Sequence, residues 1–355
     1  MKKVFLNDQG KILIRDVDPP ALEGKGAIIK TVCSFIGSGS EIGCIIAARN
    51  NPGNGTKQTP LSYQSAGRIV QKSPDLEGYT LGDFVACTGM GFAYHAEICY
   101  IPKNMMAKVP TGVTTEEAAS SNSGLTAMHA LRRCQIELGE TVLVIGLGMI
   151  GQLIAQIARV MGARVIGVDP IQVRRDKALS LGANMLLNPN KDDIVNAAFS
   201  YTKGVGVDAA IVCAKAPGSV EPMHQACRSV RQRGRVVIVG EVKREIPAEV
   251  KEIDILISRG RGPGHGDSVY EKEGTDYPLD YVRWTENRNL QEYLKMVAEK
   301  KVDIQSLISH RFHVSDAAKA YETIIHSPEK VLGVLLQYDK TRTEHLAKKG
   351  NTLAK

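Results

Sequence analysis

Three glycines that follow an apolar run could bind the pyrophosphate of a dinucleotide. They are Gly146, Gly148 and Gly151 in the stretch VLVIGLGMIG, and they form a G-x-G-x-x-G pattern between a predicted strand and a predicted helix. In such a unit the first glycine allows a tight turn, the second lets the backbone approach phosphate, and the third lets helix and strand pack closely. The pyrophosphate then lies on the helix N-terminus, where N–H groups and the helix dipole favour an anion. The alternative is a glycine turn that binds nothing.

An acidic residue at the end of the next predicted strand indicates which dinucleotide binds. The carboxylate of Asp169 in VIGVD could accept hydrogen bonds from the adenosine ribose. We therefore expect NAD rather than NADP, because Asp169 would repel a 2′-phosphate, although Arg174 could offset that repulsion. Further cofactor contacts are expected from Thr126, Met149, Ile150, Cys213 and Gly240.

The elements that must position these residues fall into two classes along the chain. Residues 1 to about 120 form many short β segments divided by Gly, Pro and Asn, which predicts a small, barrel-like β domain. The pattern then becomes helical, with Thr115 as a candidate N-cap. From Glu140 onward, short β-branched strands alternate with amphipathic helices, as in a doubly wound parallel sheet covered on both faces.

A long segment between 257 and 289 does not fit an ordinary connection. It is rich in glycine, charge and aromatic residues. Guanidinium groups bind phosphate or carboxylate through a fork of donors, and aromatic faces suit sugar rings, so we expect substrate contacts here. The alternative is a loop that orders an oligomer interface. The candidate substrate residues are Arg259, His265, Tyr281, Arg283 and Trp284.

Composition limits the class of protein. A chain of 355 residues with 43% hydrophobic and 23% charged residues predicts a globular protein of two domains. The net charge of +7 lies partly in residues 340–355, and aromatic residues make up only 5%, so nucleic-acid binding is not expected. With no long apolar run and no C-x-x-C pair among seven cysteines, we expect a cytoplasmic protein that does not bind a membrane.

Two further stretches carry a resemblance to a known family. AEICYIPKNMMAKVPTGVTTEEAA and SNSGLTAMHAL resemble the interdomain connector and the following helix of the medium-chain dehydrogenase/reductase family, and the likeness covers nearly the whole chain. It implies an α/β protein with a GroES-like β-barrel catalytic domain, residues 1–122 and 302–355, and a Rossmann NAD-binding domain, residues 123–301. It also implies a homodimer or homotetramer.

The chain departs from that family where zinc-dependent members carry their metal ligands. The corresponding stretches read Ser38-Gly39-Ser40-Glu41, Ser62-Tyr63-Gln64 and Asn122, four residues before Thr126. Zinc binds thiolate, imidazole or carboxylate, and Ser, Tyr and Asn offer none of these at neutral pH. We therefore expect no metal.

Without a metal, other groups must move the proton and stabilise the alkoxide. The candidates are the residues at the vacated positions. The phenol of Tyr63 could donate to a carbonyl oxygen, Ser40 has the place of the family's relay hydroxyl, and Asn122 could bind the reacting oxygen. Tyr63 could equally be packed under the cofactor. Glu41 is either a base or an ion-pair partner that holds the loop.

These observations predict an NAD-dependent, zinc-independent oxidoreductase that interconverts a secondary alcohol and a ketone of a sugar, cyclitol or nucleotide-linked sugar. The segment GRGPGHGDSVYEKEGTDYPLDYVRWTENRN resembles bidomain oxidoreductases of polysaccharide gene clusters, of which this would be a free-standing version. One alternative is a zinc-free enoyl or quinone reductase that uses NAD(P)H. Another is a cofactor-binding protein without turnover.

Overall fold

The computed structural model describes residues 1–338, so the basic residues 340–355 lie outside the described part of the chain. Contacts divide the chain into two compact units. Unit 1 comprises Met1–Leu125, Arg261–Lys300 and the described residues from Ile304 onward, and unit 2 comprises Thr126–Gly260 and Lys301–Asp303. No helix within residues 1–338 is long and apolar enough to cross a membrane.

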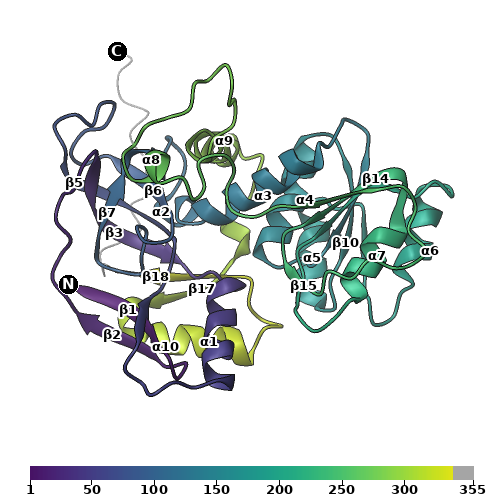
Figure 1. Ribbon diagram of the computed structural model, residues 1–355, viewed down its shortest axis with the longest axis horizontal. Helices are drawn as coiled ribbons and strands as arrows, with labels where there is room; N and C mark the ends of the chain where they lie inside the picture. The colour runs from purple at the N-terminus through teal and green to yellow at the C-terminus, as the bar shows by residue number, and fades with distance from the viewer. Residues whose placement is uncertain (339–355) are drawn as a thin grey trace, which may run out of the picture. The chain divides into compact units, whose positions relative to one another are not determined.

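Unit 2 is built on a six-stranded parallel sheet in the order β11-β10-β9-β12-β14-β16 (Figure 1). The order reverses direction between β9 and β12, which is the arrangement of a doubly wound dinucleotide-binding sheet. The predicted parallel sheet is therefore confirmed. The strands are β9 (Thr141–Ile145), β10 (Arg164–Val168), β11 (Met185–Leu187), β12 (Val207–Val212), β14 (Val230–Ile238) and β16 (Asp254–Ile257), with a separate pair, β13 (Lys215–Ala216) and β15 (Glu241–Val242).

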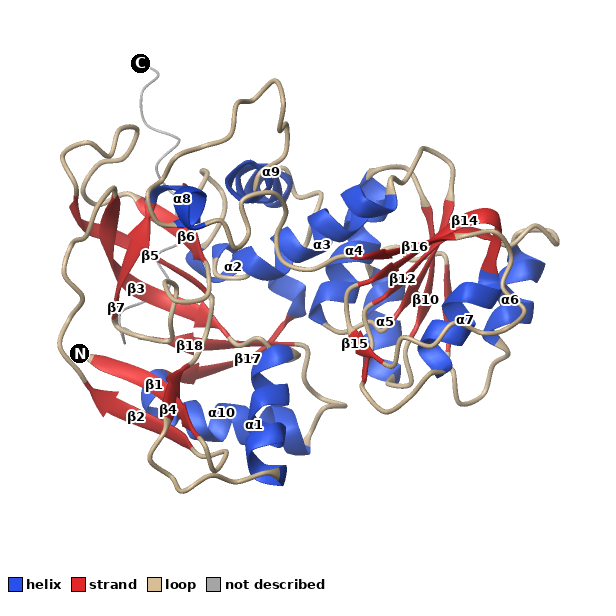
Figure 2. Cartoon of the chain, in the orientation of Figure 1, coloured by secondary structure: helices blue, strands red, loops and turns tan. Residues whose placement is uncertain are grey.

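Helices cover both faces of this sheet (Figure 2). On one face α4 packs on α5, and on the other α6 packs on α7. The sheet residues between them are apolar and buried, as expected of parallel strands covered on both sides. The helices are α4 (Met149–Val160), α5 (Gln172–Ser180), α6 (Ile194–Tyr201) and α7 (Glu221–Ser229), and α3 (Ser121–Cys134) contains the boundary between the units in the chain.

Unit 1 contains the predicted β-rich region as two sheets. One is a three-stranded antiparallel sheet in the order β2-β1-β4. The other is a seven-stranded mixed sheet in the order β17-β18-β3-β5-β6-β8, with β7 paired to β3. The strands are β1 (Lys2–Asn7), β2 (Ile12–Asp16), β3 (Gly26–Phe35), β4 (Gln58–Pro60), β5 (Gln64–Lys72), β6 (Phe84–Thr88), β7 (Ile98–Pro102), β8 (Met106–Lys108), β17 (Ile308–His313) and β18 (Gly333–Gln337).

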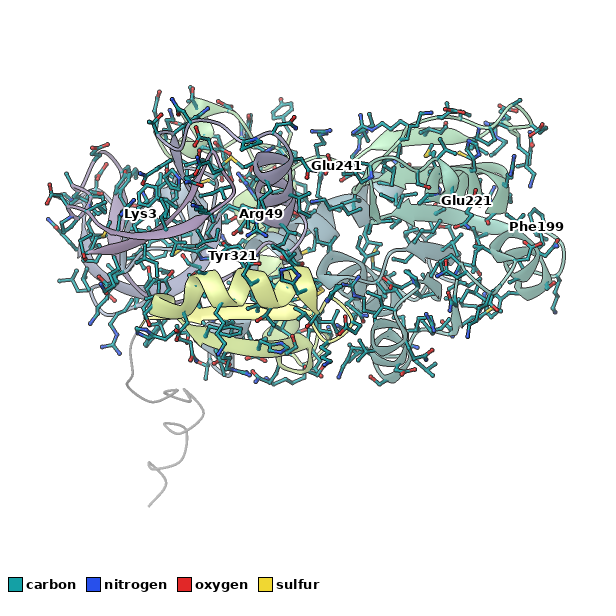
Figure 3. All side chains as sticks on the ribbon, turned by 90° about the horizontal axis from the view of Figure 1, so that it is seen from below. Lys3, Arg49, Phe199, Glu221, Glu241 and Tyr321 are labelled. Atoms are coloured by element: carbon teal, nitrogen blue, oxygen red, sulfur yellow. The ribbon has the colours of Figure 1, made fainter. Side chains whose placement is uncertain are left out.

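Two helices of unit 1 pack against each other beside these sheets. They are α1 (Ser40–Asn50) and α10 (Ala317–His326), and Figure 3 shows Arg49 of α1 and Tyr321 of α10. Arg49 forms an ion pair with Glu322, and Ile45 and Tyr321 are both fully buried. The sequence predicted α10 but missed α1, because the residues around the G-S-G turn resemble a loop. Three short 3-10 turns are η1 (Lys103–Met105), η2 (Gln305–Leu307) and η3 (Val314–Asp316).

The helix predicted after residue 114 begins one residue earlier than expected. Thr114, not Thr115, is the N-cap of α2 (Thr115–Ala118). The hydroxyl of Thr114 accepts from the backbone N–H of Glu117, whose carboxylate accepts from the N–H of Thr114. This reciprocal pair satisfies two donors at the start of the helix, and Thr115 has no equivalent partner three residues on.

The segment predicted as a loop between 257 and 289 contains a short helix, α8 (Ser268–Glu271), and the start of α9 (Glu286–Ala298). We expected residues 261–300 in the nucleotide-binding domain. Contacts instead group them with unit 1, because α9 packs on β8 and η1 and α8 packs on η1. The side chains of this segment therefore belong to the same unit as Tyr63.

The three glycines after β9 have the geometry that the pattern requires. Gly146 has a φ of 95°, in the left-handed region, and Gly148 caps α4 with open space around the place of a Cβ. A Cβ on Gly151 would lie 1.9 Å from the carbonyl oxygen of Gly146. The backbone conformation thus favours glycine at position 146, close packing requires it at position 151, and position 148 has open space for an approaching ligand.

The contact at Gly151 makes a stability prediction. We expect Gly151→Ala to lower the free energy of unfolding by about 1–3 kcal/mol, because overpacking forces the backbone apart. Gly218→Ala is the matched control, because a Cβ there would meet open space, and it should change that free energy by less than about 0.5 kcal/mol. Urea unfolding of both variants checks this; equal stabilities would contradict the close packing of α4 on the turn.

Candidate active site

Two hydroxyl groups predicted to move protons lie together in unit 1. The Ser40 hydroxyl at the start of α1 and the Tyr63 phenol just before β5 are hydrogen-bonded at 2.7 Å. Ser40 is exposed and Tyr63 is partly exposed. The structure thus pairs a phenol with a hydroxyl that water can reach.

The backbone on both sides of Tyr63 is shaped to hold its ring. A Cβ on Gly37 would lie 1.9 Å from the phenol oxygen, so only glycine leaves room for the ring there. Ser62 has a φ of 82°, which is unusual for a residue with a side chain. Its hydroxyl accepts from the N–H of Gln64 at 3.2 Å. Strain of this kind is tolerated where the surroundings determine a functional geometry.

Glu41 is buried and its carboxylate is occupied by three donors. It accepts from the N–H of Gly37 at 2.8 Å and from the hydroxyl of Tyr321, and its Oε2 lies 3.2 Å from Nε2 of His95. His95 continues the chain through Nδ1 to Ser34 at 2.6 Å. These contacts hold the carboxylate of Glu41 in place, and its role as a base or as an ion-pair partner stays a prediction.

Asn122 lies at the start of α3. Its Oδ1 accepts from the hydroxyl of Thr88 at 3.1 Å and from the guanidinium of Arg261 at 3.3 Å. The next residue is tied to the Tyr63 segment, since the N–H of Ser123 donates to Oε1 of Gln64 at 3.0 Å. Asn122 and Tyr63 are therefore linked through neighbouring residues.

The surroundings of Tyr63 keep its phenol protonated. Desolvation raises the pKa of Tyr63 above its ordinary value, and the negative charge of Glu41 raises it further. The hydrogen bond with Ser40 and the positive charge of Arg261 act in the opposite direction. A neutral phenol can donate a proton but is a poor base.

The donor set of this pocket does not fit zinc. Ser40, Tyr63 and Asn122 provide a hydroxyl, a phenol and an amide, whereas zinc binds thiolate, imidazole or carboxylate. The carboxylate of Glu41, although near, already has three donors. No chemical step at these residues is therefore assigned to a zinc ion.

A cluster of charged side chains that the sequence did not predict surrounds Arg261. Its Nε donates to Glu286 at 2.9 Å and its Nη2 donates to Glu271 at 2.8 Å. His265 lies 3.3 Å from Glu286 and 3.6 Å from Glu271. His265, Glu271 and Glu286 could each offer one ligand atom to a metal, but Arg261 already neutralises these carboxylates.

The other residues predicted to bind substrate are spread over the segment. Arg259 and Arg283 are exposed, and Tyr281 is 88% exposed. The guanidinium of Arg283 lies 4.0 Å from the centre of the Trp284 ring. Of the five, His265 is the one that lies in the charged cluster with Arg261. The contribution of the other four to binding stays a prediction.

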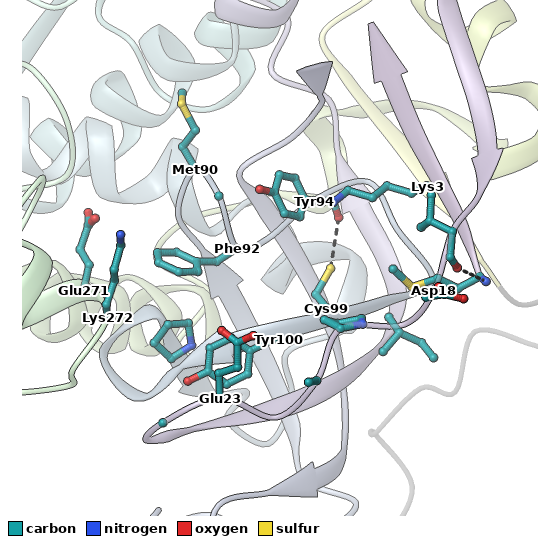
Figure 4. Close-up of a pocket in the computed structure, with 18 of the residues that line it drawn as sticks. Lys3, Asp18, Glu23, Met90, Phe92, Tyr94, Cys99, Tyr100, Glu271 and Lys272 are labelled. Atoms are coloured by element: carbon teal, nitrogen blue, oxygen red, sulfur yellow. Dashed lines mark hydrogen bonds between the residues drawn. The ribbon is translucent and has the colours of Figure 1, made fainter. Parts of the chain in front are cut away.

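Unit 1 also has an open groove of about 840 Å³ (Figure 4). Phe92, Tyr94 and Tyr100 line it together with charged residues, among them Glu271. Ser40, Tyr63 and Asn122 are not among the described residues that line it. The ammonium group of Lys3 lies 3.6 Å from the centre of the Tyr94 ring, so that aromatic face is already covered.

In unit 2, the carboxylate of Asp169 is held beside the glycine turn. It accepts from the N–H of Leu147 and from the N–H of Ile171, both at 2.8 Å, and Arg174 lies 3.6 Å from it. Asp169 therefore fixes the turn that follows β9.

Most of the remaining predicted cofactor residues of unit 2 lie at or next to the ends of helices and strands. Met149 and Ile150 begin α4, and Cys213 follows β12. A Cβ on Gly240 would lie 2.1 Å from the carbonyl oxygen of Ala214. Thr126 lies within α3. In an open parallel sheet, ligands bind outside the carboxyl ends of the strands where the strand order reverses.

Comparison with known proteins supports the family that the sequence resembles. Residues 149–261 match the family model for zinc-binding dehydrogenases. A sorbitol dehydrogenase of Halalkalibacterium halodurans is 27% identical over 299 residues, which cover 74% of this chain and 79% of that protein. A D-guloside 3-dehydrogenase of Shigella flexneri is 27% identical over 265 residues, covering 74% and 72%.

The fold is also that of solved dehydrogenases. An oxidoreductase/dehydrogenase of unknown specificity from Escherichia coli matches with a TM-score of 0.79 at 19% identity, over 96% of this chain and 100% of that chain. The predicted α/β fold class is thereby confirmed. The chain is an oxidoreductase of the alcohol dehydrogenase type.

Membership of this class of oxidoreductase implies a nicotinamide cofactor and a small-molecule substrate. The matches support the medium-chain dehydrogenase/reductase family. The residues matched by the zinc-binding model, 149–261, do not include Ser40, Tyr63 or Asn122. The match to the zinc-binding family model therefore does not cover the residues of unit 1 that align with the family's metal-binding positions.

The charged cluster of this oxidoreductase predicts a pH-dependent stability. Glu271 and then Glu286 raise the pKa of His265 from 6.5 to about 9. A raised pKa in the folded state stabilises the protein below pH 6.5 and loses that contribution as the pH rises through about 9. We expect the difference in free energy of unfolding between wild type and His265→Gln to be largest near pH 6 and to disappear once the pH exceeds the folded-state pKa of about 9.

Urea unfolding at several pH values measures this difference. The variant Glu271→Gln removes the largest cause of the shift and should flatten the pH dependence. A difference between wild type and His265→Gln that stays constant from pH 6 to pH 10 would contradict the protonated state of His265.

Proposed function

We propose that this protein is an NAD-dependent, zinc-independent dehydrogenase or ketoreductase that interconverts a secondary alcohol and a ketone on a sugar, cyclitol or nucleotide-linked sugar. The observation that carries the proposal is the hydrogen bond between Ser40 and Tyr63, two residues that the family resemblance aligns with a relay hydroxyl and with a metal ligand. These groups can transfer a proton, which is the task left when the metal is absent.

The proposed chemistry needs a hydride and a proton. A bound nicotinamide supplies or accepts the hydride. In the direction of reduction, the O–H bond of Tyr63 breaks and its proton goes to the carbonyl oxygen of the substrate, leaving a phenolate. Ser40, which is exposed, returns a proton to that phenolate from water.

The two remaining residues of the pocket hold and tune this pair. Asn122 binds the reacting oxygen through its amide, and Glu41 keeps Tyr63 protonated between turnovers by its negative charge. Because the pKa of Tyr63 is raised, reduction is the direction that these groups favour at neutral pH.

The substrate class rests on the loop and on the relatives. The charged and aromatic side chains of Arg259, Tyr281, Arg283 and Trp284 suit a polyhydroxylated, anionic molecule. The relatives by sequence are named sorbitol dehydrogenase and D-guloside 3-dehydrogenase. Both names describe dehydrogenases of a polyol or a sugar derivative.

Two alternatives separate from this proposal by simple assays. An enoyl or quinone reductase would consume NADPH with quinones or activated double bonds and leave polyols unchanged. A cofactor-binding protein without turnover would bind NADH and convert no member of a polyol and ketose panel. Hydroxyl-rich products together with NADH specificity would support the dehydrogenase.

The role of Tyr63 gives the first functional prediction. We expect Tyr63→Phe to lower kcat by about 100-fold or more, because it removes a positioned proton donor. The affinity for NADH should stay unchanged, since the glycine turn belongs to unit 2. Steady-state kinetics and calorimetric NADH titration measure the two quantities.

The matched control is Tyr79→Phe, which removes a phenol that donates to the carbonyl of Met106 in the same unit. It should keep the wild-type kcat. Full activity in Tyr63→Phe, or an equal loss in both variants, would assign Tyr63 to packing. Activity that appears only when zinc is added would contradict the metal-free chemistry.

The cofactor preference gives a second prediction. Asp169→Asn removes the charge that would repel a 2′-phosphate and leaves Arg174, 3.6 Å away, to attract it. We expect the ratio of NADPH to NADH affinity to rise about tenfold or more, the scale of a hydrogen bond to a charged group. Calorimetric titration with both cofactors checks this, and a wild type that already binds NADPH more tightly would refute the NAD preference.

A further inference from the structure

We propose that Arg261 is a positioning residue of the catalytic pocket: its guanidinium holds the amide of Asn122 and supplies the fixed positive charge beside the reacting oxygen. This inference rests on the proposed function, because it assigns Arg261 a part in the proton transfer at Tyr63. It also gives the charged cluster of the segment 261–286 a chemical task.

The guanidinium of Arg261 is fixed in one orientation. Arg261 is 5% exposed, and three of its nitrogens have separate partners. Nε donates to Glu286 at 2.9 Å, Nη2 to Glu271 at 2.8 Å, and Nη1 to Asn122 at 3.3 Å. Because the guanidinium is planar, the two carboxylates that bind Nε and Nη2 also fix the direction of Nη1. Nη1 is directed at the amide oxygen of Asn122.

The cluster around Arg261 carries balanced charge. Its two carboxylates, Glu271 and Glu286, face two cations, since the pKa of His265 is raised to about 9 and its imidazole is protonated at neutral pH. A buried charge without a partner is strongly destabilising. This balance lets the chain hold a guanidinium next to Asn122, and a divalent metal there would have to displace it.

Asn122 transmits the position of Arg261 to the catalytic pair. Its Oδ1 receives donors from both Arg261 and Thr88, so the amide oxygen faces these two groups and the amide nitrogen is directed elsewhere. Ser123 then binds Gln64, the residue after Tyr63. An amide whose carbonyl is polarised by a cation is a stronger donor through its N–H groups.

The charge of Arg261 also acts on Tyr63 directly. It lowers the pKa of Tyr63, whereas desolvation, Glu41 and Cys44 raise it and the hydrogen bond with Ser40 lowers it. A phenolate left after proton donation is stabilised by a nearby cation. Removal of Arg261 should therefore make the phenol a weaker acid.

The kinetic test compares three variants. Arg261→Gln should lower kcat by about 100-fold, the usual effect of losing one oxyanion-stabilising group, with NADH affinity unchanged. Arg261→Lys keeps a charge and should restore part of the lost kcat. Arg288→Gln is the control, because Arg288 orders the same segment through Asp276 and Tyr277.

Loss of Arg261 leaves two carboxylates with one cation, so Arg261→Gln could fold poorly. The double variant Arg261→Gln/Glu286→Gln restores the charge balance with His265 and Glu271. It should fold as well as wild type by urea unfolding and still show the loss of kcat. Added guanidinium ion should restore part of the activity of Arg261→Gly and leave Arg288→Gly unchanged.

A readout without turnover separates this inference from the proposed function. A fluorotyrosine of lower intrinsic pKa is placed at position 63, and its titration is followed by fluorine NMR in wild type, Arg261→Gln and Arg288→Gln. The midpoint should rise by about half a unit or more in Arg261→Gln only. This holds even if no polyol is converted and the proposed function fails.

Two results would overturn the role of Arg261. One is an unchanged titration midpoint together with wild-type kcat in the folded double variant. The other is stoichiometric zinc or magnesium in the purified wild type that is lost in His265→Gln, which would make the cluster a metal site. If the midpoint is unshifted in Arg261→Gln while the wild type is an active dehydrogenase, the role of Arg261 is rejected and the proposed function is retained.

Discussion

The hydrogen bond between Tyr63 and Ser40 is the interaction on which the proposed chemistry depends, and the charges of Glu41 and Arg261 act on the pKa of that phenol in opposite directions. Desolvation and Glu41 keep the phenol neutral, while Arg261 favours the phenolate. A proton donor must be protonated before the reaction and tolerable as an anion after it. In the proposed mechanism the surroundings of Tyr63 provide both conditions.

The backbone around Tyr63 and Glu41 holds these two side chains in place. Gly37 leaves space for the phenol that no other residue would leave. The N–H of the same residue donates to Oε1 of Glu41, and the hydroxyl of Tyr321 of α10 donates to Oε2. The helices α1 and α10 and the end of β3 are thus joined at one buried charge. In unit 2 a buried carboxylate also fixes a turn: Asp169 binds the backbone of the turn whose glycines would receive pyrophosphate.

The sequence predicted features that depend on local geometry and missed those that depend on distant contacts. The turn at Gly146 and the parallel strands of unit 2 follow from spacing and composition, and the structure has them. Helix α1 was missed because its start is rich in glycine and serine, and Thr115 was predicted as the cap that Thr114 provides. The cluster of Arg261, Glu271 and Glu286 joins positions up to 25 residues apart, and no short pattern indicates that they meet.

The most direct test of proton donation by Tyr63 is a single-turnover reduction of a ketose by NADH, with protein freed of metal by chelation. Rates are compared in H₂O and D₂O with light and deuterated NADH. If Tyr63 donates the proton during hydride transfer, both isotope effects appear on one step in wild type, and Tyr63→Phe loses the solvent effect. A protein that reacts only after zinc is returned, or a solvent effect that survives in Tyr63→Phe, would contradict a metal-free phenol as the proton donor.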